Sequence, residues 1–130
     1  QSSENPVFYL QYAHARICSI FRQAAEAGVE AKAGERLDYQ VLSTEWETNL
    51  IKKLGEYPEE VSAAAAERAP HRIARYVHDL AGMFHTFYNQ CRIIGVERDV
   101  QLARLALVKG VQGVLRHGLG ILGISAPERM

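Results

Sequence analysis

Aromatic and basic side chains at helical spacing near the start of the chain could bind an unstacked nucleic-acid base. Tyr9, Tyr12 and Arg16 are separated by three and four residues, which places them on one face of a predicted helix. Phenol rings can stack on bases, and a guanidinium group can meet a phosphate. The first helix therefore presents a candidate RNA-binding face.

A second cluster of the same kind occurs in the later half of the chain. Tyr88 and Arg92 repeat the four-residue spacing of Tyr12 and Arg16, and His85 precedes Tyr88 by three residues. Side-by-side packing of the two helices would form an aromatic, cationic cleft. The alternative is that the tyrosines are half-buried with hydrogen-bonded hydroxyl groups, while the arginines pair with carboxylates.

The segment 118–123, GLGILG, matches the spacing of a dinucleotide-binding loop. That motif needs a strand before it and a helix after it. Here a predicted helix precedes the glycines, and only seven residues follow them. We therefore interpret this segment as a helix that unwinds into a packed tail.

The histidines of the fourth predicted helix do not have the spacing of a metal site. His71, His78, His85 and Arg92 recur every seven residues, so neighbours lie ~10 Å apart along a helix. Metal–ligand bonds are ~2 Å long, so this stripe is predicted to be solvated or RNA-facing. The sequence also has no nucleophile placed beside a base and an orienting partner. We expect no catalytic residue, no metal site and no cofactor in this chain.

Composition favours a soluble globular domain. The chain has 130 residues, of which 48% are hydrophobic and 23% charged. No apolar run reaches the ~18 residues of a membrane span, and the polar first residues predict no signal peptide. Cys18 and Cys91 have neither a disulfide nor a metal pattern, so we expect buried, reduced thiols in a cytoplasmic protein. No membrane partner is expected, and we expect a monomer.

Net charge is zero but unevenly distributed. Residues 1–69 carry 7 basic and 11 acidic side chains, net −4, and residues 70–130 carry 8 and 4, net +4. The second half could form a basic face. Alternatively, folding interleaves the two halves and cancels the asymmetry.

Capping signals define the expected helices. Asn5 and Pro6 start the first, which ends near Ala27 before Gly28. Thr44 and Glu47 form a capping box for the second, which stops at Gly55. The third starts near residue 57. The fourth is expected to run from residue 70 to a cap at Gly95, and Asp99 is expected to cap the fifth. Residues 28–42 are a connector to which we assign no chemistry.

Apolar residues at helical spacing indicate an all-α helical bundle of about five or more helices. The expected core stripe of the first helix is Leu10, Ala13, Ile17, Phe21 and Ala24. That of the second is Trp46, Leu50, Ile51 and Leu54. That of the fourth is Ile73, Val77, Leu80, Phe84, Phe87, Cys91 and Ile94. That of the fifth is Val100, Ala103, Leu107, Val111 and Val114. Small residues are expected to form a close-packing groove at Ala106, Gly110 and Gly113.

Three segments resemble one family. Residues 5–16, NPVFYLQYAHAR, resemble the segment where bacterial arginyl-tRNA synthetases pass from the catalytic domain to the C-terminal helical domain. Residues 118–130, GLGILGISAPERM, are similar to that family's C-terminus. Residues 74–81, ARYVHDLA, and 84–92, FHTFYNQCR, also match. The resemblance covers the chain apart from residues 1–4 and a variable stretch near 28–42.

The resemblance implies a single anticodon-binding domain over residues 1–130, from which the catalytic domain is missing. Both class I signatures, His-Ile-Gly-His and Lys-Met-Ser-Lys-Ser, are absent, so this chain should not aminoacylate. The parent enzyme would use ATP and Mg²⁺ to attach arginine to its tRNA. The partners implied are the anticodon loop of an arginine-acceptor tRNA, whose middle cytosine the family reads, and the missing catalytic domain. The positions that the family places near the anticodon loop are Tyr9, Tyr12, Arg16, Tyr88, Arg92 and Met130.

Two alternatives stay open. The aromatic faces could belong to a helical protein-interaction module that does not bind RNA. A related synthetase with the same type of helical domain is also possible, although the ending Ala-Pro-Glu-Arg-Met favours the arginine enzyme.

Overall fold

In the computed structural model, which describes residues 5–31 and 33–130, every regular element is a helix. The elements are α1 (Pro6–Glu26), the 3₁₀ turn η1 (Tyr39–Val41), α2 (Glu45–Gly55), α3 (Tyr57–Glu67), α4 (Pro70–Gln90) and α5 (Arg98–Ile121). This confirms the all-α prediction. Residues 1–4, which lie outside the family resemblance, also lie outside the described residues.

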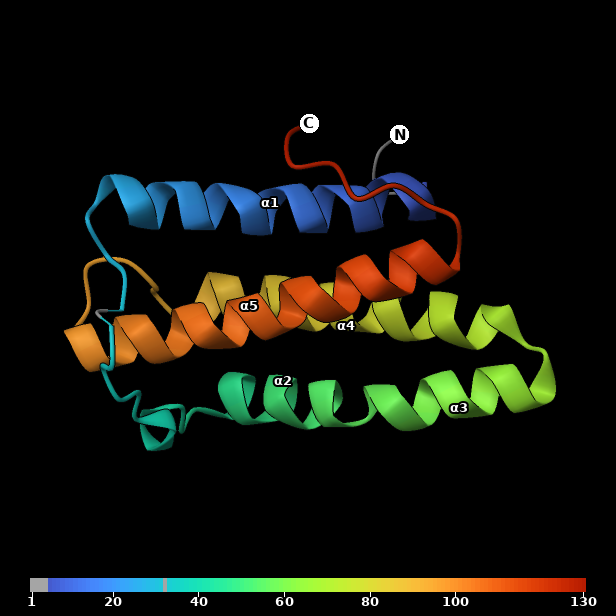
Figure 1. Cartoon of the computed structure of the whole chain (residues 1–130), viewed down its shortest axis with the longest axis horizontal. Coiled ribbons are helices and arrows are strands. Elements are labelled where there is room, and N and C mark those ends of the chain that lie inside the picture. The colour runs from blue at the N-terminus through green and yellow to red at the C-terminus, as the bar shows by residue number, and fades with distance from the viewer. Residues whose placement is uncertain (1–4, 32) are drawn as a thin grey trace.

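The helices form three layers (Figure 1). α4 and α5 run antiparallel in the middle, α1 lies on one side of them, and α2 and α3 follow almost end to end on the other side. α1 runs parallel to α4. The chain after α5 returns across α1, so its C-terminal segment lies on the same side of the molecule as α1.

The predicted caps of the first two helices are confirmed. Asn5 Oδ1 accepts from Phe8 N at 3.1 Å, and Gly28 adopts a positive φ of 73° just beyond the helix end. The side chains of Thr44 and Glu47 form a reciprocal capping box at the start of α2. These local signals determine where α1 and α2 begin.

Two predicted boundaries were wrong. α4 ends at Gln90 rather than before Gly95, because Cys91 is extended with φ −122° and ψ 115°. Apolar periodicity continues past the helix because Cys91 and Ile93 are still buried. α5 begins at Arg98 with Glu97 as its N-cap, so Asp99 lies inside the first turn rather than at the cap.

The expected core stripes are largely buried, with α4 contributing the largest side chains, Phe84 and Phe87. Several expected core residues lie at the margin instead. Trp46 and Phe21 are half-buried, and Ile51 of α2 is exposed. Cys91 is buried, whereas Cys18 is only half-buried, and both thiols are free.

The closest approach between helices occurs at Gly118, outside the groove predicted from Ala106, Gly110 and Gly113. Within that groove, Gly110 lies against α2, where a Cβ atom would be 3.4 Å from Leu54 Cδ1. A Cβ atom on Gly118 would lie 2.5 Å from Val77 Cγ1, whereas one on Gly113 would meet nothing within 4 Å. Gly118 therefore sets how closely α5 can approach α4.

The GLGILG segment is a helix end followed by a packed tail, as predicted. α5 continues to Ile121, and Gly123 then turns the chain with a φ of 73°. The tail runs along α1, where Gln11 Nε2 donates to Ser125 O at 3.2 Å and His14 Nδ1 lies 2.9 Å from Pro127 O. These contacts bring the end of the described chain beside α1. Among the described residues, no helix is long and apolar enough to cross a membrane.

Candidate nucleic-acid interface

The rings of α1 interdigitate with those of α4. The ring centroid of Tyr9 lies 5.0 Å from that of His78 and 5.6 Å from that of His85, which lies one heptad further along α4. The Tyr12 ring stacks on His85 at 6.1 Å with an interplanar angle of 28°. Because α1 and α4 are parallel, Tyr9 and Tyr12 of α1 contact His78 and His85 of α4 in the same order along both helices.

This series of ring contacts between α1 and α4 ends in a cation–π contact between Arg16 and Tyr88. The guanidinium carbon of Arg16 lies 4.2 Å from the ring centroid of Tyr88. Cation–π contacts of this type are worth ~0.5–2 kcal/mol, depending on exposure. Among the described residues, Arg16 forms no ion pair with a carboxylate. Its charge therefore remains available to an anionic ligand.

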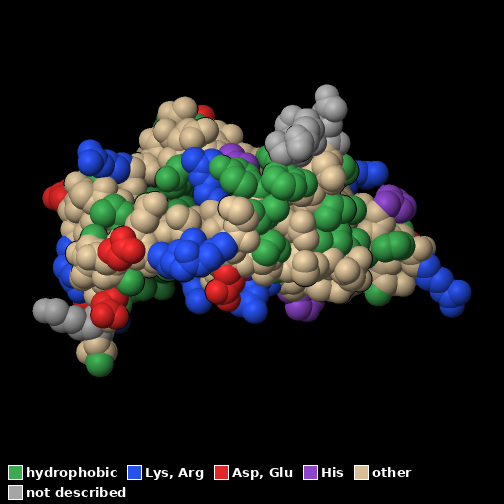
Figure 2. Space-filling model, turned by 90° about the horizontal axis from the view of Figure 1, so that it is seen from above, with side chains coloured by type: hydrophobic (Ala, Val, Ile, Leu, Met, Phe, Trp, Pro, Cys, Tyr) green, Lys and Arg blue, Asp and Glu red, His purple; other side chains and the backbone are tan. Residues whose placement is uncertain are grey.

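A pocket of about 500 Å³ opens beside this contact. Four of the predicted site residues line it together: Tyr12, Arg16, Tyr88 and Met130. None of its described lining residues is acidic, and Arg22 and Arg129 add further basic side chains. The face that bears α1 and the tail shows basic side chains beside apolar ones (Figure 2). The pocket is therefore both aromatic and cationic.

Arg92 lines a neighbouring pocket that shares Tyr88 with the first. It lies just beyond α4, where its Nε donates to Ile94 O at 3.0 Å. Gly95, with a φ of 89°, lies against its guanidinium group, because a Cβ atom there would be 3.3 Å from Arg92 Nη2. The turn after α4, rather than the helix itself, thus presents this arginine.

Tyr9 and His85 lie between the helices and do not line either pocket. Burial raises the pKa of Tyr9. Burial, and next the nearby charge of Arg16, lower the pKa of His85 below its ordinary value of 6.5. Its Nδ1 atom is buried and has no hydrogen-bond partner among the described residues. The structure therefore places His85 against the Tyr12 ring, in surroundings that favour its neutral form.

Sequence reasoning missed part of the pocket wall: Ser19, Arg22, Gln23 and Arg129. Ser19 follows Tyr12 by seven residues and Gln23 follows Arg16 by seven, so the heptad of α1 could have indicated both. Arg129 comes to the pocket through the fold of the tail, for which no local pattern exists. In the described part of the chain, no group of three or more His, Cys, Asp or Glu side chains could hold a metal ion.

The arrangement of helices is that of the same region in solved arginyl-tRNA synthetases. It superposes on the Thermus thermophilus enzyme with a TM-score of 0.78 and 36% identity, over 94% of this chain and 21% of that one. The fold is also similar to that of the Plasmodium falciparum enzyme, with a TM-score of 0.73 and 23% identity over 94% of this chain and 21% of that chain.

The chain belongs to the DALR anticodon binding domain family, whose model matches residues 10–130. It is 54% identical over 130 residues to the arginine–tRNA ligase of Carboxydothermus hydrogenoformans, and 53% identical to that of Symbiobacterium thermophilum. Each match covers 100% of this chain and 23% of the relative. The chain thus spans about a quarter of the length of these curated relatives.

Proposed function

We propose that residues 1–130 fold as one domain that binds the anticodon loop of an arginine-acceptor tRNA. The observation that supports this most directly is the pocket in which Tyr12, Arg16 and Tyr88 meet. Single-stranded RNA loops are recognised by stacking their splayed bases on aromatic or guanidinium planes. The exposed ring of Tyr12 offers such a plane, and Arg16, which has no carboxylate partner among the described residues, offers charge to a phosphate.

The pocket also suits discrimination between bases. Ser19 and Gln23 supply polar groups beside the stacking surfaces. A base whose edge leaves buried polar groups unpaired binds less tightly. Within this proposal, Arg92 meets the RNA backbone from the neighbouring pocket, and Met130 closes the far wall.

A titration tests this function. The chain is titrated with an arginine-acceptor tRNA and with the same tRNA altered at the middle anticodon base. We expect the unaltered tRNA to bind more tightly, with an affinity that falls as salt increases, at a slope of ~0.7 per neutralised phosphate. Equal affinity for the two tRNAs, or no binding at low salt, would reject anticodon recognition and favour a protein-interaction module.

The relatives also support a proposal about the longer parent enzyme. Because the relatives are arginine–tRNA ligases about four times as long, we infer that the parent chain attaches arginine to tRNA in the cytoplasm, acting as a monomer. ATP and Mg²⁺ would be bound by the part of the parent chain that lies outside residues 1–130. The chain alone should form no arginyl-tRNA when mixed with ATP, arginine and tRNA.

A further inference from the structure

A buried ion pair lies directly behind the turn that presents Arg92. The carboxylate of Glu47 on α2 is fully buried, and Arg104 on α5 donates through Nε to its Oε2 atom at 2.6 Å. The backbone N–H of Thr44 donates to the other oxygen of Glu47 at 3.0 Å. Burial alone would raise the pKa of Glu47, but the hydrogen bonds from Arg104 and Thr44 outweigh it and lower that pKa. These contacts favour the charged form of Glu47, which accepts a hydrogen bond from Arg104.

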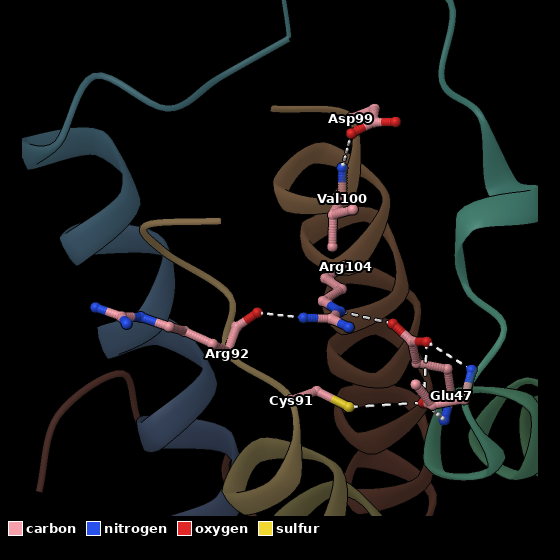
Figure 3. A network of polar contacts seen from close by, with 7 residues as sticks. Glu47, Cys91, Arg92, Asp99, Val100 and Arg104 are labelled. Carbon is pink, nitrogen blue, oxygen red and sulfur yellow. Dashed lines mark hydrogen bonds and ion pairs between the residues drawn. The ribbon is translucent and has the colours of Figure 1, made fainter. Parts of the chain in front are cut away.

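A second guanidinium nitrogen of Arg104 donates a hydrogen bond to the main chain of Arg92. Its Nη1 atom donates to the carbonyl oxygen of Arg92 at 2.5 Å. Figure 3 shows that the carbonyl and the side chain of Arg92 point in opposite directions. Fixing the carbonyl on the α5 side therefore directs the guanidinium group towards the other side, where residues of α1 and Tyr88 line the pocket.

The following residues brace the same turn. Arg92 Nε donates to Ile94 O at 3.0 Å, and Gly95 N donates to Gln101 Oε1 at 2.8 Å. Arg92 lies beyond the end of α4, so the regular bonding of that helix does not determine its conformation. The bond within the turn and the side-chain contacts from Gln101 and Arg104 of α5 hold it instead.

We propose that Arg104 is a positioning residue for RNA binding, and that it acts by holding Arg92 in place. This inference rests on the proposed function. Arg104 itself is poorly placed to contact RNA, because its side chain is 13% exposed and its charge is paired with Glu47. Its effect on RNA must therefore pass through Arg92.

The first experiment needs no RNA. Amide hydrogen exchange is compared between the unaltered chain and Arg104→Gln, with Arg98→Gln as the matched control. Arg98 is another arginine of α5 in an ion pair, with Glu35 at 2.8 Å, and its side chain also donates to the carbonyl oxygen of Glu30. We expect exchange at residues 92–96 to accelerate in Arg104→Gln and to remain unchanged in Arg98→Gln. Unchanged exchange in Arg104→Gln would overturn the positioning role.

The second experiment is a double-mutant cycle on affinity for the arginine-acceptor tRNA. Arg92→Ala and Arg104→Gln should each weaken binding about tenfold, the loss expected for one charge-assisted contact. If Arg104 acts through Arg92, the double variant should bind as Arg92→Ala does, because no contact remains to be positioned. A loss near a hundredfold, the product of the two single effects, would overturn the proposal.

Stability is separated from positioning by two further variants. Glu47→Gln keeps a capping side chain for α2 but removes the charge that holds Arg104. It should therefore give a smaller loss of tRNA affinity that also vanishes in the Arg92→Ala background. Arg104→Lys can reach only one of the two acceptors and should restore binding in part. If both variants fold and bind tRNA as the unaltered chain does, the proposal is overturned.

The outcomes distinguish this inference from the proposed function. Failure of the unaltered chain to bind tRNA would reject the proposed function and this inference with it. Binding by the unaltered chain that is insensitive to Arg104→Gln or to Arg92→Ala would reject this inference alone.

Discussion

Among single residues, Tyr12 offers the clearest separation of RNA binding from stability. Its ring is 43% exposed, so truncation removes little buried surface. Stacking on one base is worth ~1–3 kcal/mol, so we expect Tyr12→Ala to weaken tRNA binding roughly tenfold to a hundredfold. Filter binding or fluorescence anisotropy measures this loss. Tyr39→Ala is the matched control, because Tyr39 is 59% exposed on η1 and lies outside the pocket. An equal loss in both variants would contradict the assignment.

His85 should make the stability of the chain depend on pH. Because burial and Arg16 lower its pKa in the folded state, the unfolded chain takes up the proton first as pH falls below about 6.5. The free energy of unfolding should therefore decrease from pH 6.5 down to the lowered folded-state pKa. Urea titrations across this range measure the trend. His85→Leu should flatten it, and an equally steep trend in that variant would assign the effect to another group.

Residue types and spacing predicted only in part which of the site residues lie together. The two i, i+4 aromatic–arginine pairs indicated that Tyr12, Arg16 and Tyr88 could meet, and the structure brings them to one pocket. The same patterns did not reveal that Tyr9 would be packed between histidines. The spacing of residues predicts which face of a helix a side chain occupies. How deeply an aromatic ring is buried depends on which residues of the neighbouring helix lie opposite it.

At the scale of helices, α5 provides a matched pair of glycine substitutions, one facing α4 and one facing open space. Gly118→Ala would place a methyl group 2.5 Å from Val77 Cγ1, so we expect a loss of roughly 1–3 kcal/mol in the free energy of unfolding. Gly113→Ala enters open space and should stabilise α5 by up to about 1 kcal/mol. Chemical denaturation of the two variants measures both effects.

A rescue distinguishes the clash from other causes. In the Val77→Ala background, Gly118→Ala should cost less than in the unaltered chain, because the opposing methyl group is gone. An undiminished cost would mean that the contact with Val77 is not the source of the destabilisation.

Helix starts that carry a side-chain cap were predicted correctly, whereas the uncapped start of α5 and the end of α4 were not. Asn5 and the Thr44–Glu47 box are short-range hydrogen-bonding patterns, and the structure contains both. The end of α4 was wrong because Cys91 continues the apolar spacing in an extended conformation. Apolar periodicity reports burial, and a chain leaving a helix can stay buried.

For the whole molecule, the tail completes the pocket without belonging to the central bundle. Deleting residues 125–130 removes Arg129 and Met130 from the pocket wall, so we expect tRNA affinity to fall about tenfold. The helical circular dichroism should persist, because the buried core cluster lies within residues 10–119. The control is the double variant Arg129→Ala and Met130→Ala, which keeps the main chain on α1. Full affinity after deletion would show that the tail has no part in binding.

The helical bundle could be predicted from composition and apolar periodicity, whereas the path of the tail after α5 could not. Its contacts with α1 join residues 113 and 114 positions apart, such as His14 with Pro127 and Gln11 with Ser125. No local pattern encodes such a pairing, because each partner is an ordinary polar group in its own segment.

The position of α1 also has a consequence for the order of folding. Its main contacts with other helices are with α4 and α5, which follow it only after α2 and α3 have been completed. Contacts at such sequence separations form slowly, because loop-closure entropy is lost before they contribute. We expect α2 to α5 to assemble first and α1 to dock late. Since docking creates the contact between Arg16 and Tyr88, bound RNA should slow the undocking of α1, and native-state exchange in α1 should reveal that protection.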